Sequence, residues 1–119
     1  MASNEELVSL EDVHIDELLQ HVMDSKGSEL RIAPGFPPCV RVHGRLKAIT
    51  AYENFSAQIM WRLINDLLTN EQMRQLESEG QLTFFYTTAD ATAYYNVLVF
   101  RVISGTCAQF HLLLPLNPV

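Results

Sequence analysis

The side chains best able to do chemistry in this 119-residue sequence are its few cations, and they are unevenly placed. Residues 1–24 carry seven acidic side chains and no Lys or Arg, whereas residues 26–47 carry five bases and one acid. Guanidinium and ammonium groups bind carboxylates and phosphates. Two interpretations stay open: a solvated surface whose halves partly neutralise each other, or a basic edge that docks on an acidic partner through Arg41, Arg45 and Lys47 as interface residues.

Histidine, carboxylate and thiol side chains form no recognisable catalytic or metal-binding pattern. His14 and His21 share a helix face with Glu17 between them, but a structural zinc site needs about four ligands, so solvated histidines are expected. Cys39 and Cys107 lie in strand-like surroundings and are expected to pack as small apolar side chains. The sequence has no G-x-x-x-x-G-K-[ST], G-x-G-x-x-G, G-x-S-x-G, H-E-x-x-H or C-x-x-C motif. We therefore predict no catalytic residue, no metal and no cofactor.

Aromatic residues gather in the C-terminal half, where Phe84, Phe85, Tyr86, Tyr94 and Tyr95 could line a small-molecule site. Aromatic residues in strands are more often core residues or cross-strand pairs. Both interpretations stay open, with the structural one favoured.

Composition narrows the class of protein. Hydrophobic residues make up 48% and charged residues 18%, the balance of one globular domain. Eight Lys and Arg against fourteen Asp and Glu give a net charge of −6, which argues against nucleic-acid binding. No apolar run reaches the roughly 20 residues needed to cross a bilayer, and the start lacks a leader pattern, so direct membrane insertion is not expected. With too few cysteines for a disulfide scaffold, we expect a cytoplasmic domain with free thiols.

Apolar spacing and capping residues predict the order of elements. Helices are predicted at about 14–26, from Ser56 to about 67, and from a capping box at Thr69 to Gly80. Lys26 and Gly27 are expected to close the first helix, with the glycine as a left-handed cap. Strands are predicted at 28–32, 39–49 (a hairpin around His43 and Gly44), 82–87, 94–103 and 106–114. This order of one helix, three strands, two helices and three strands predicts an α+β domain, an antiparallel sheet with helices packed on one face.

The hairpin has a further pattern. Its apolar residues alternate along the sequence with its basic residues. The apolar set is Val40, Val42, Leu46 and Ala48, and the basic set is Arg41, Arg45 and Lys47. Period-two alternation predicts one buried face and one basic, solvated face.

Six segments in order resemble the N-terminal, PAS-like domain of type IV pilus retraction ATPases, the PilT-like motors of pili and type II secretion. They are Ile15-Asp-Glu-Leu-Leu19, Gly27-Ser-Glu-Leu-Arg-Ile32, Pro37-Pro38 with Val40-Arg-Val-His-Gly-Arg-Leu46, Leu68-Thr-Asn-Glu-Gln72, Val97-Leu-Val-Phe-Arg101 and Phe110-His-Leu-Leu-Leu-Pro115. The resemblance covers about residues 13–115. It implies a PAS-like domain there, a flexible segment at 1–12, and a tail or the start of a linker at 116–119.

In that family a RecA-like motor domain follows, the assembly is a hexamer, and arginines of this domain reach toward nucleotide phosphate or a neighbouring subunit. In the family, several of these arginines lie in the last strands of the domain. When the family pattern is aligned with this chain, only Arg101 is still an arginine. Tyr94, Asn96, Ile103 and His111 stand at the other arginine positions, and Leu98 stands at a family asparagine. A phenol, an amide or an alkyl group does not replace a bidentate guanidinium at a phosphate site. The resemblance thus implies Arg101, Asn96 and Tyr94 as nucleotide- or partner-contacting positions.

The resemblance and its departures together predict a non-catalytic interaction or regulatory domain of a pilus or secretion motor system. Its partner would be a motor ATPase domain or a second copy, as a homodimer, or as a hexamer within a full-length motor. Two alternatives stay open: a small-ligand-sensing PAS-like domain, and the excised N-terminal fragment of an active hexameric pilus ATPase.

Overall fold

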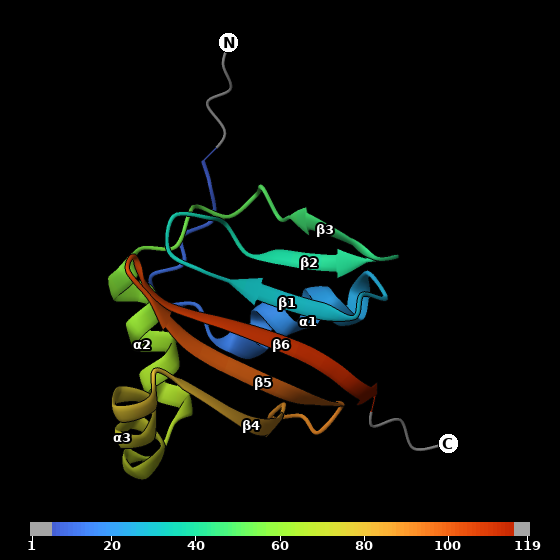
Figure 1. The fold of residues 1–119 in the computed structure, drawn as a ribbon. Coiled ribbons are helices and arrows are strands. Elements are labelled where there is room, and N and C mark those ends of the chain that lie inside the picture. The colour runs from blue at the N-terminus through green and yellow to red at the C-terminus, as the bar shows by residue number, and fades with distance from the viewer. Residues whose placement is uncertain (1–5, 116–119) are drawn as a thin grey trace.

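The computed structural model describes residues 6–115, and they form one antiparallel sheet with three helices (Figure 1). The helices are α1 (Ile15–Asp24), α2 (Ala57–Leu67) and α3 (Asn70–Glu79); the strands are β1 (Glu29–Ile32), β2 (Cys39–Val42), β3 (Arg45–Ala48), β4 (Gln81–Thr87), β5 (Ala93–Val102) and β6 (Gly105–Pro115). The predicted α+β class and element order are confirmed. Residues 1–5, and with them part of the expected flexible segment, lie outside the described residues, as does the expected tail at 116–119.

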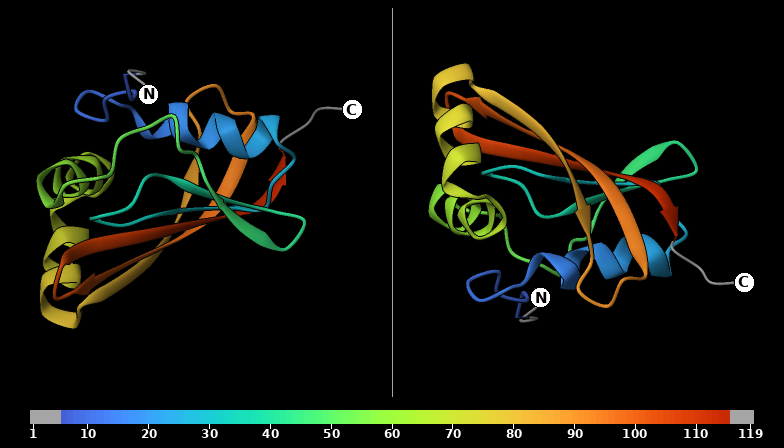
Figure 2. Two further views of the ribbon diagram at one scale, coloured as in Figure 1. Left: turned by 90° about the horizontal axis from the view of Figure 1, so that it is seen from above. Right: turned by 90° about the horizontal axis from the view of Figure 1, so that it is seen from below.

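The strands lie in the order β3-β2-β1-β6-β5-β4, so the two chain halves meet where β1 pairs with β6. Helices α1 and α2 cover one face of the sheet, and α3 lies beside the start of β4 (Figures 1 and 2). The other face is called the open face below, and the strand register shows that every second side chain lies on it. Its residues include Cys39, Arg41, Leu46, Ala48, Glu29, Arg31, Gln109, His111, Tyr94, Asn96, Leu98, Thr83 and Phe85. The helix-covered face carries the alternate residues.

Each helix begins at a side chain that accepts a hydrogen bond from the first turn. The predicted capping box is confirmed: Gln72 N donates to Thr69 Oγ1 (3.1 Å), and Thr69 N donates to Gln72 Oε1 (2.9 Å). Ser56 caps α2 in the same way. At α1 the cap is His14, whose Nδ1 accepts from Asp16 N at 3.0 Å, so this histidine has a structural role that the sequence did not indicate.

The end of α1 differs from the expected glycine cap. Lys26, with φ 57°, is the residue in the left-handed region there, and Gly27 is not in that region. Gly27 is needed for another reason: a Cβ at this position would lie 2.8 Å from the carbonyl oxygen of Arg41 and 2.8 Å from Val40 Cγ1. The missing side chain lets the chain after α1 pack closely against β2.

The expected one-sided basic hairpin is wrong. Arg41 stands opposite Leu46, and Val42 stands opposite Arg45, across the two-residue turn at His43 and Gly44. Directly opposite residues of an antiparallel pair share a face of the sheet. Because the turn has two residues, odd-numbered residues of β2 stand opposite even-numbered residues of β3. Odd-numbered residues of the two strands therefore lie on opposite faces of the sheet. Arg41 lies on the open face, whereas Arg45 and Lys47 lie on the other side of β3.

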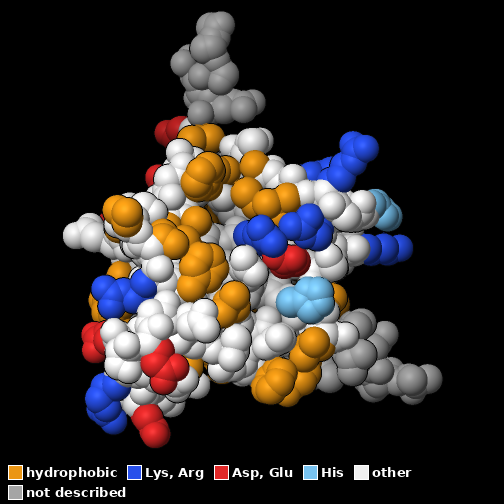
Figure 3. All heavy atoms as spheres, viewed as in Figure 1, with side chains coloured by type: hydrophobic (Ala, Val, Ile, Leu, Met, Phe, Trp, Pro, Cys, Tyr) orange, Lys and Arg blue, Asp and Glu red, His pale blue; other side chains and the backbone are white. Residues whose placement is uncertain are grey.

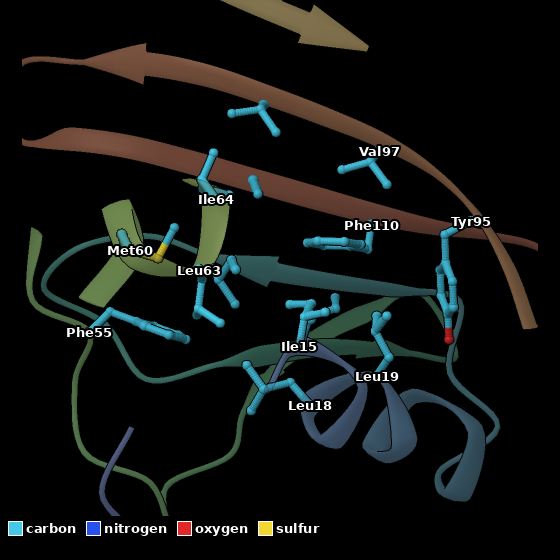
Figure 4. Packing of buried hydrophobic residues seen from close by; sticks show 14 of the residues in the cluster. Ile15, Leu18, Leu19, Phe55, Met60, Leu63, Ile64, Tyr95, Val97 and Phe110 are labelled. Carbon is cyan, nitrogen blue, oxygen red and sulfur yellow. The ribbon is translucent and has the colours of Figure 1, made fainter. Parts of the chain in front are cut away.

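The core lies between α1, α2 and the helix-covered face of the sheet. Leu18 and Leu19 of α1 and Phe110 of β6 are at most 1% exposed, and Figure 4 shows them with residues of α2 in one packed layer. Tyr95 is fully buried and meets Phe110 edge to face. Burial of this apolar surface is the main stabilising contribution to the fold.

The five clustered aromatic residues are divided by the sheet. Phe84, Tyr86 and Tyr95 lie on the helix-covered face, while Phe85 and Tyr94 stack at 5.6 Å between ring centres on the open face. Alternation along each strand thus separates residues that are neighbours in sequence. The cluster is not a single ligand box.

Residues 8–10 of the segment expected to be flexible are held by hydrogen bonds. Val8 N donates to Ala51 O at 2.7 Å, and Leu10 N donates to a carboxylate oxygen of Glu53 at 2.8 Å. Leu10 is completely buried. Among residues 6–115, no helix has both the length and the apolar character needed to cross a bilayer.

Candidate functional site on the open face of the sheet

An ion-pair cluster occupies the middle of the open face. Glu29 of β1 accepts hydrogen bonds from Arg31 Nε at one carboxylate oxygen and from Arg41 Nε at the other, at 3.3 Å. Its side chain is 11% exposed, whereas those of Arg41 and Arg31 are 29% and 41% exposed. The Glu29 carboxylate is thus sequestered beneath two guanidinium groups that water and a partner can reach.

The cluster has an excess of positive charge. Burial by itself would raise the pKa of Glu29, but hydrogen bonds and positive charge from Arg31, and then from Arg41, outweigh it and lower the pKa below its ordinary value. The carboxylate therefore stays ionised at neutral pH, and two cations share one anion. Arg41 also donates from Nη1 to Gly44 O at 3.1 Å, which fixes its position over β2.

An apolar hollow of about 220 Å³ borders this cluster on the side of the hairpin. Its lining consists of Arg31, Ala33, Phe36, Pro37, Cys39 and Leu46. Phe36 is 61% exposed and Leu46 is 43% exposed, so the hollow is edged by apolar groups that water contacts directly. Figure 3 shows the charged cluster over β1 and β2, with hydrophobic side chains on both sides of it.

On the other side of the cluster the open face becomes neutral. His111 stands between Glu29 and Asn96 in the register, and Asn96 stands opposite Phe85. Phe85 is 62% exposed and stacks on Tyr94. The face therefore runs from an apolar hollow, across a cationic centre, to an amide and an aromatic stack.

The structure brings together some of the predicted site residues and separates others. Tyr94, Asn96 and Arg41 lie on the open face, although Arg41 is three strands away from the other two. Arg101 lies on the opposite side of β5, near its end, where its backbone N–H donates to Gly80 O. Its side chain is exposed and makes no hydrogen bond or ion pair within residues 6–115.

Sequence reasoning missed Glu29, Arg31 and Phe36. The available signal was Glu29, the one acid within the basic stretch 26–47, because a single carboxylate among cations is a typical centre for an ion-pair cluster. The resemblance placed family arginines or an asparagine at Tyr94, Asn96, Leu98, Ile103 and His111. All of these lie on the open face except Ile103, which lies in the exposed turn between β5 and β6. The substitutions thus concentrate on one surface.

A second hollow, of about 170 Å³, lies between the start of α1, α2 and Tyr86 of β4. Arg62 Nη2 donates to the carbonyl oxygens of Leu10 and Val13, at 3.2 and 3.0 Å, and Arg62 Nη1 lies 3.6 Å from the Asp66 carboxylate. This arginine ties the segment before α1 to α2. The charge of Arg62 is paired with Asp66, although its buried Nε–H has no hydrogen-bond partner among residues 6–115.

The histidine and carboxylate side chains of α1 have a structural partner. Tyr52 Oη donates to Glu17 Oε2 at 3.0 Å and lies 3.1 Å from His21 Nε2, so His21 is more than a solvated residue. Burial, with the Glu17 hydrogen bond and charge, raises the pKa of Tyr52 to about 12. Within residues 6–115 no three His, Cys, Asp or Glu side chains are grouped as metal ligands.

Comparison of the sequence with protein-family models and with curated proteins gave no match. Solved structures do share the fold. The pilus retraction motor PilT with bound ADP superposes with a TM-score of 0.76 at 19% identity, covering 84% of this chain and 29% of that one. The ATPase DotB of Legionella pneumophila gives 0.69 at 21% identity, covering 89% and 32%, and DotB of Yersinia pseudotuberculosis gives 0.72 at 14%, covering 100% and 34%.

These comparisons confirm the expected resemblance at the level of the fold. The chain spans about a third of the length of the ATPases that it matches, and it is similar to one part of each.

Proposed function

We propose that this chain is a non-catalytic interaction domain that docks, in the cytoplasm, on the motor domain of a PilT-type ATPase through the open face of its sheet. The observation that carries the proposal is the composition of that face: an arginine-rich cluster around a sequestered carboxylate, flanked by exposed aromatic and aliphatic groups. Tyr, Phe and Arg are enriched in protein–protein interfaces. The fold likeness to one third of several motor ATPases suggests the class of partner.

The departures from the family pattern favour a protein surface over a nucleotide as the ligand. At the positions where the resemblance expects arginines, the open face carries Tyr94, Asn96 and His111. Tight phosphate binding needs several converging cationic donors. A stacked phenol and an amide instead suit a partner that offers apolar and polar side chains.

The test is binding between this chain and the separately produced motor domain of a PilT-type ATPase from the same genome, measured by calorimetry. We expect Arg41→Ala to weaken binding at least about tenfold, because it removes a partly exposed guanidinium from the ion-pair cluster of the face. Arg45→Ala is the matched control, since the same side chain is removed from the same hairpin on the opposite side. Both variants should keep the thermal unfolding midpoint of the parent, which shows that each is folded when its binding is measured.

Absence of a complex with the parent chain would contradict the proposal. Equal weakening by Arg45→Ala would instead favour the whole basic hairpin as the contact surface. A Walker motif in the reading frame after residue 119 would place the docking within one longer polypeptide, as the fragment alternative requires.

The small-ligand alternative has less support. The two hollows described above measure about 170 and 220 Å³, and pockets for small molecules usually measure about 300–1,000 Å³. Native mass spectrometry of freshly purified protein tests it, because a retained small molecule would appear as an added mass.

A further inference from the structure

The two edges of the sheet differ in how they are protected. The edge strand β3 has four residues and carries Arg45 and Lys47, both exposed. The edge strand β4 has seven residues, Gln-Leu-Thr-Phe-Phe-Tyr-Thr, with no charge and no proline, and it pairs with β5 without a register shift. Long, uncharged edge strands without a bulge are templates for pairing with another strand. The edge strand β4 therefore lacks the charges and the short length that protect β3.

Two hydrogen bonds show which backbone groups of β4 face outward. Arg101 N donates to Gly80 O at 3.0 Å, and Thr88 N donates to Ala93 O at 3.1 Å. In an antiparallel ladder, alternate residues bond to the neighbouring strand. The residues bonded to β5 are therefore Leu82, Phe84 and Tyr86, while those with outward N–H and C=O groups are Gln81, Thr83, Phe85 and Thr87.

The accessible part of this edge is centred on Phe85. Helix α3 lies beside the first part of β4, where a hollow is lined by Gln75, Glu79, Gln81, Leu82 and Thr83. The stretch from Thr83 to Thr87 is left for pairing, and Phe85 is its middle residue. Phe85 is 62% exposed on the open face, and its ring already stacks on Tyr94.

We propose that β4 pairs antiparallel with β4 of a second copy of this chain across a two-fold axis at Phe85. In this register Phe85 stands opposite Phe85 of the second copy, and Thr83 stands opposite Thr87. Outward N–H and C=O groups then satisfy one another, and the Phe85–Tyr94 stack of each copy continues into that of the other. Aromatic pairs and Thr–Thr pairs are both stabilising across antiparallel strands.

Charge favours a second copy at β4 over one at β3. A β3–β3 pairing would bring Arg45 and Lys47 close to the same cations of the second copy, whereas β4 brings only neutral side chains together. Each copy has a net charge of −6, so the remaining repulsion is long-range and is screened by salt. The dimer is therefore expected to tighten with added NaCl.

The dimer does not depend on docking to a motor domain, and its test uses the isolated full chain alone. Sedimentation equilibrium over a concentration series measures the dimer dissociation constant. We expect Phe85→Lys, which puts a charge at the two-fold axis, to raise that constant at least about tenfold. Leu46→Lys is the matched control, because it adds the same charge on the same face of the sheet at the other edge, and it should leave the constant unchanged.

Disulfide trapping gives a second readout that does not depend on affinity. A directly hydrogen-bonded antiparallel pair has Cα atoms about 5.5 Å apart, within the range that a disulfide spans. In a Cys39→Ser background, with Cys107 buried, Phe85→Cys should form a covalent dimer on mild oxidation, and Leu46→Cys should not.

A strict monomer at the highest soluble concentration, together with no covalent Phe85→Cys dimer, would overturn the proposal. Cross-linking at Leu46→Cys instead would move the interface to β3 and would also overturn it. So would capture of a strand from another protein at β4 while this chain by itself stays monomeric. None of these outcomes bears on binding of the motor domain through Arg41.

Discussion

The two faces of the sheet differ in burial and in residue type, although the same strands supply both. Along β5, Tyr95, Val97 and Val99 are fully buried against the helices, while the intervening Asn96 is exposed and Leu98 is half-buried. Across the sheet the helix-covered face holds the apolar core, and the open face holds a charged cluster and an aromatic stack. The difference indicates that stability resides mainly in the helix-covered face, and the open face is the one for which we propose docking.

The first prediction tests this division with one phenylalanine from each face. Phe110→Ala removes a fully buried ring and should lower the free energy of unfolding by about 3–5 kcal/mol. Phe85→Ala removes a ring that is 62% exposed and should lower it by less than about 1 kcal/mol. Urea denaturation measures both. Similar losses for the two variants would mean that the open face contributes to the core.

The second prediction concerns Glu29, whose carboxylate is sequestered on the open face. Glu29→Gln leaves Arg31 and Arg41 side by side without a carboxylate and should destabilise the chain by roughly 1–2 kcal/mol, a value reduced because Arg31 is partly exposed. Asp66→Asn is the control, since its pair with Arg62 is exposed and should change stability by less than about 0.5 kcal/mol. If Glu29→Gln left the free energy of unfolding unchanged, the cluster would make no contribution to stability.

The third prediction compares two tyrosines. Tyr86 donates from Oη to Asp16 Oδ1 at 2.6 Å and joins β4 to α1, so Tyr86→Phe should cost about 1 kcal/mol in thermal or urea unfolding. Tyr94 stacks on Phe85, and this contact uses the ring, so Tyr94→Phe should leave stability unchanged. Loss of stability in Tyr94→Phe would reveal a hydroxyl contact that supports the fold.

The smallest expected effect is a pH dependence. The pKa of Glu29 is lower in the folded chain than its ordinary value of 4.5, so the folded state favours the ionised carboxylate. Its stabilising contribution is present above about pH 4.5 and is lost as the pH falls through the lowered pKa. Urea midpoints measured from pH 6 to pH 3 should therefore fall less steeply for Glu29→Gln than for the parent. Parallel curves would contradict the assignment.

Local signals in the sequence were sufficient for the elements. The Thr69 and Gln72 capping box and the left-handed Gly80 mark both ends of α3, because these are interactions within a few residues of chain. The buried stripe of α1 follows from its helical spacing. At Gly27 the local rule was wrong, because the position is decided by contact with β2, which lies more than ten residues away in sequence.

The candidate site could be predicted only in part. Arg41, Asn96 and Tyr94 all lie on the open face, whereas Arg45, Lys47 and Arg101 do not, and the contacts expected of all six stay predictions. The two-residue turn at His43 and Gly44 sets which residues of β2 and β3 stand opposite each other, and this pairing decides which bases share a face. The alternation of apolar and basic residues along the sequence does not reveal that pairing. The cluster at Glu29 also needs the β1–β2 register, which brings Arg41 opposite it.

By itself the sequence determined the helices, the strands, their order and the α+β class, because backbone propensity, capping and apolar periodicity act between near neighbours in the chain. Only the tertiary structure decided which face stays open, which cations gather around Glu29, and which edge strand is left without charge. Those features depend on pairings such as β1 with β6, between residues about eighty positions apart. Such pairings are fixed by packing of the whole sheet against its helices, and no local pattern encodes them.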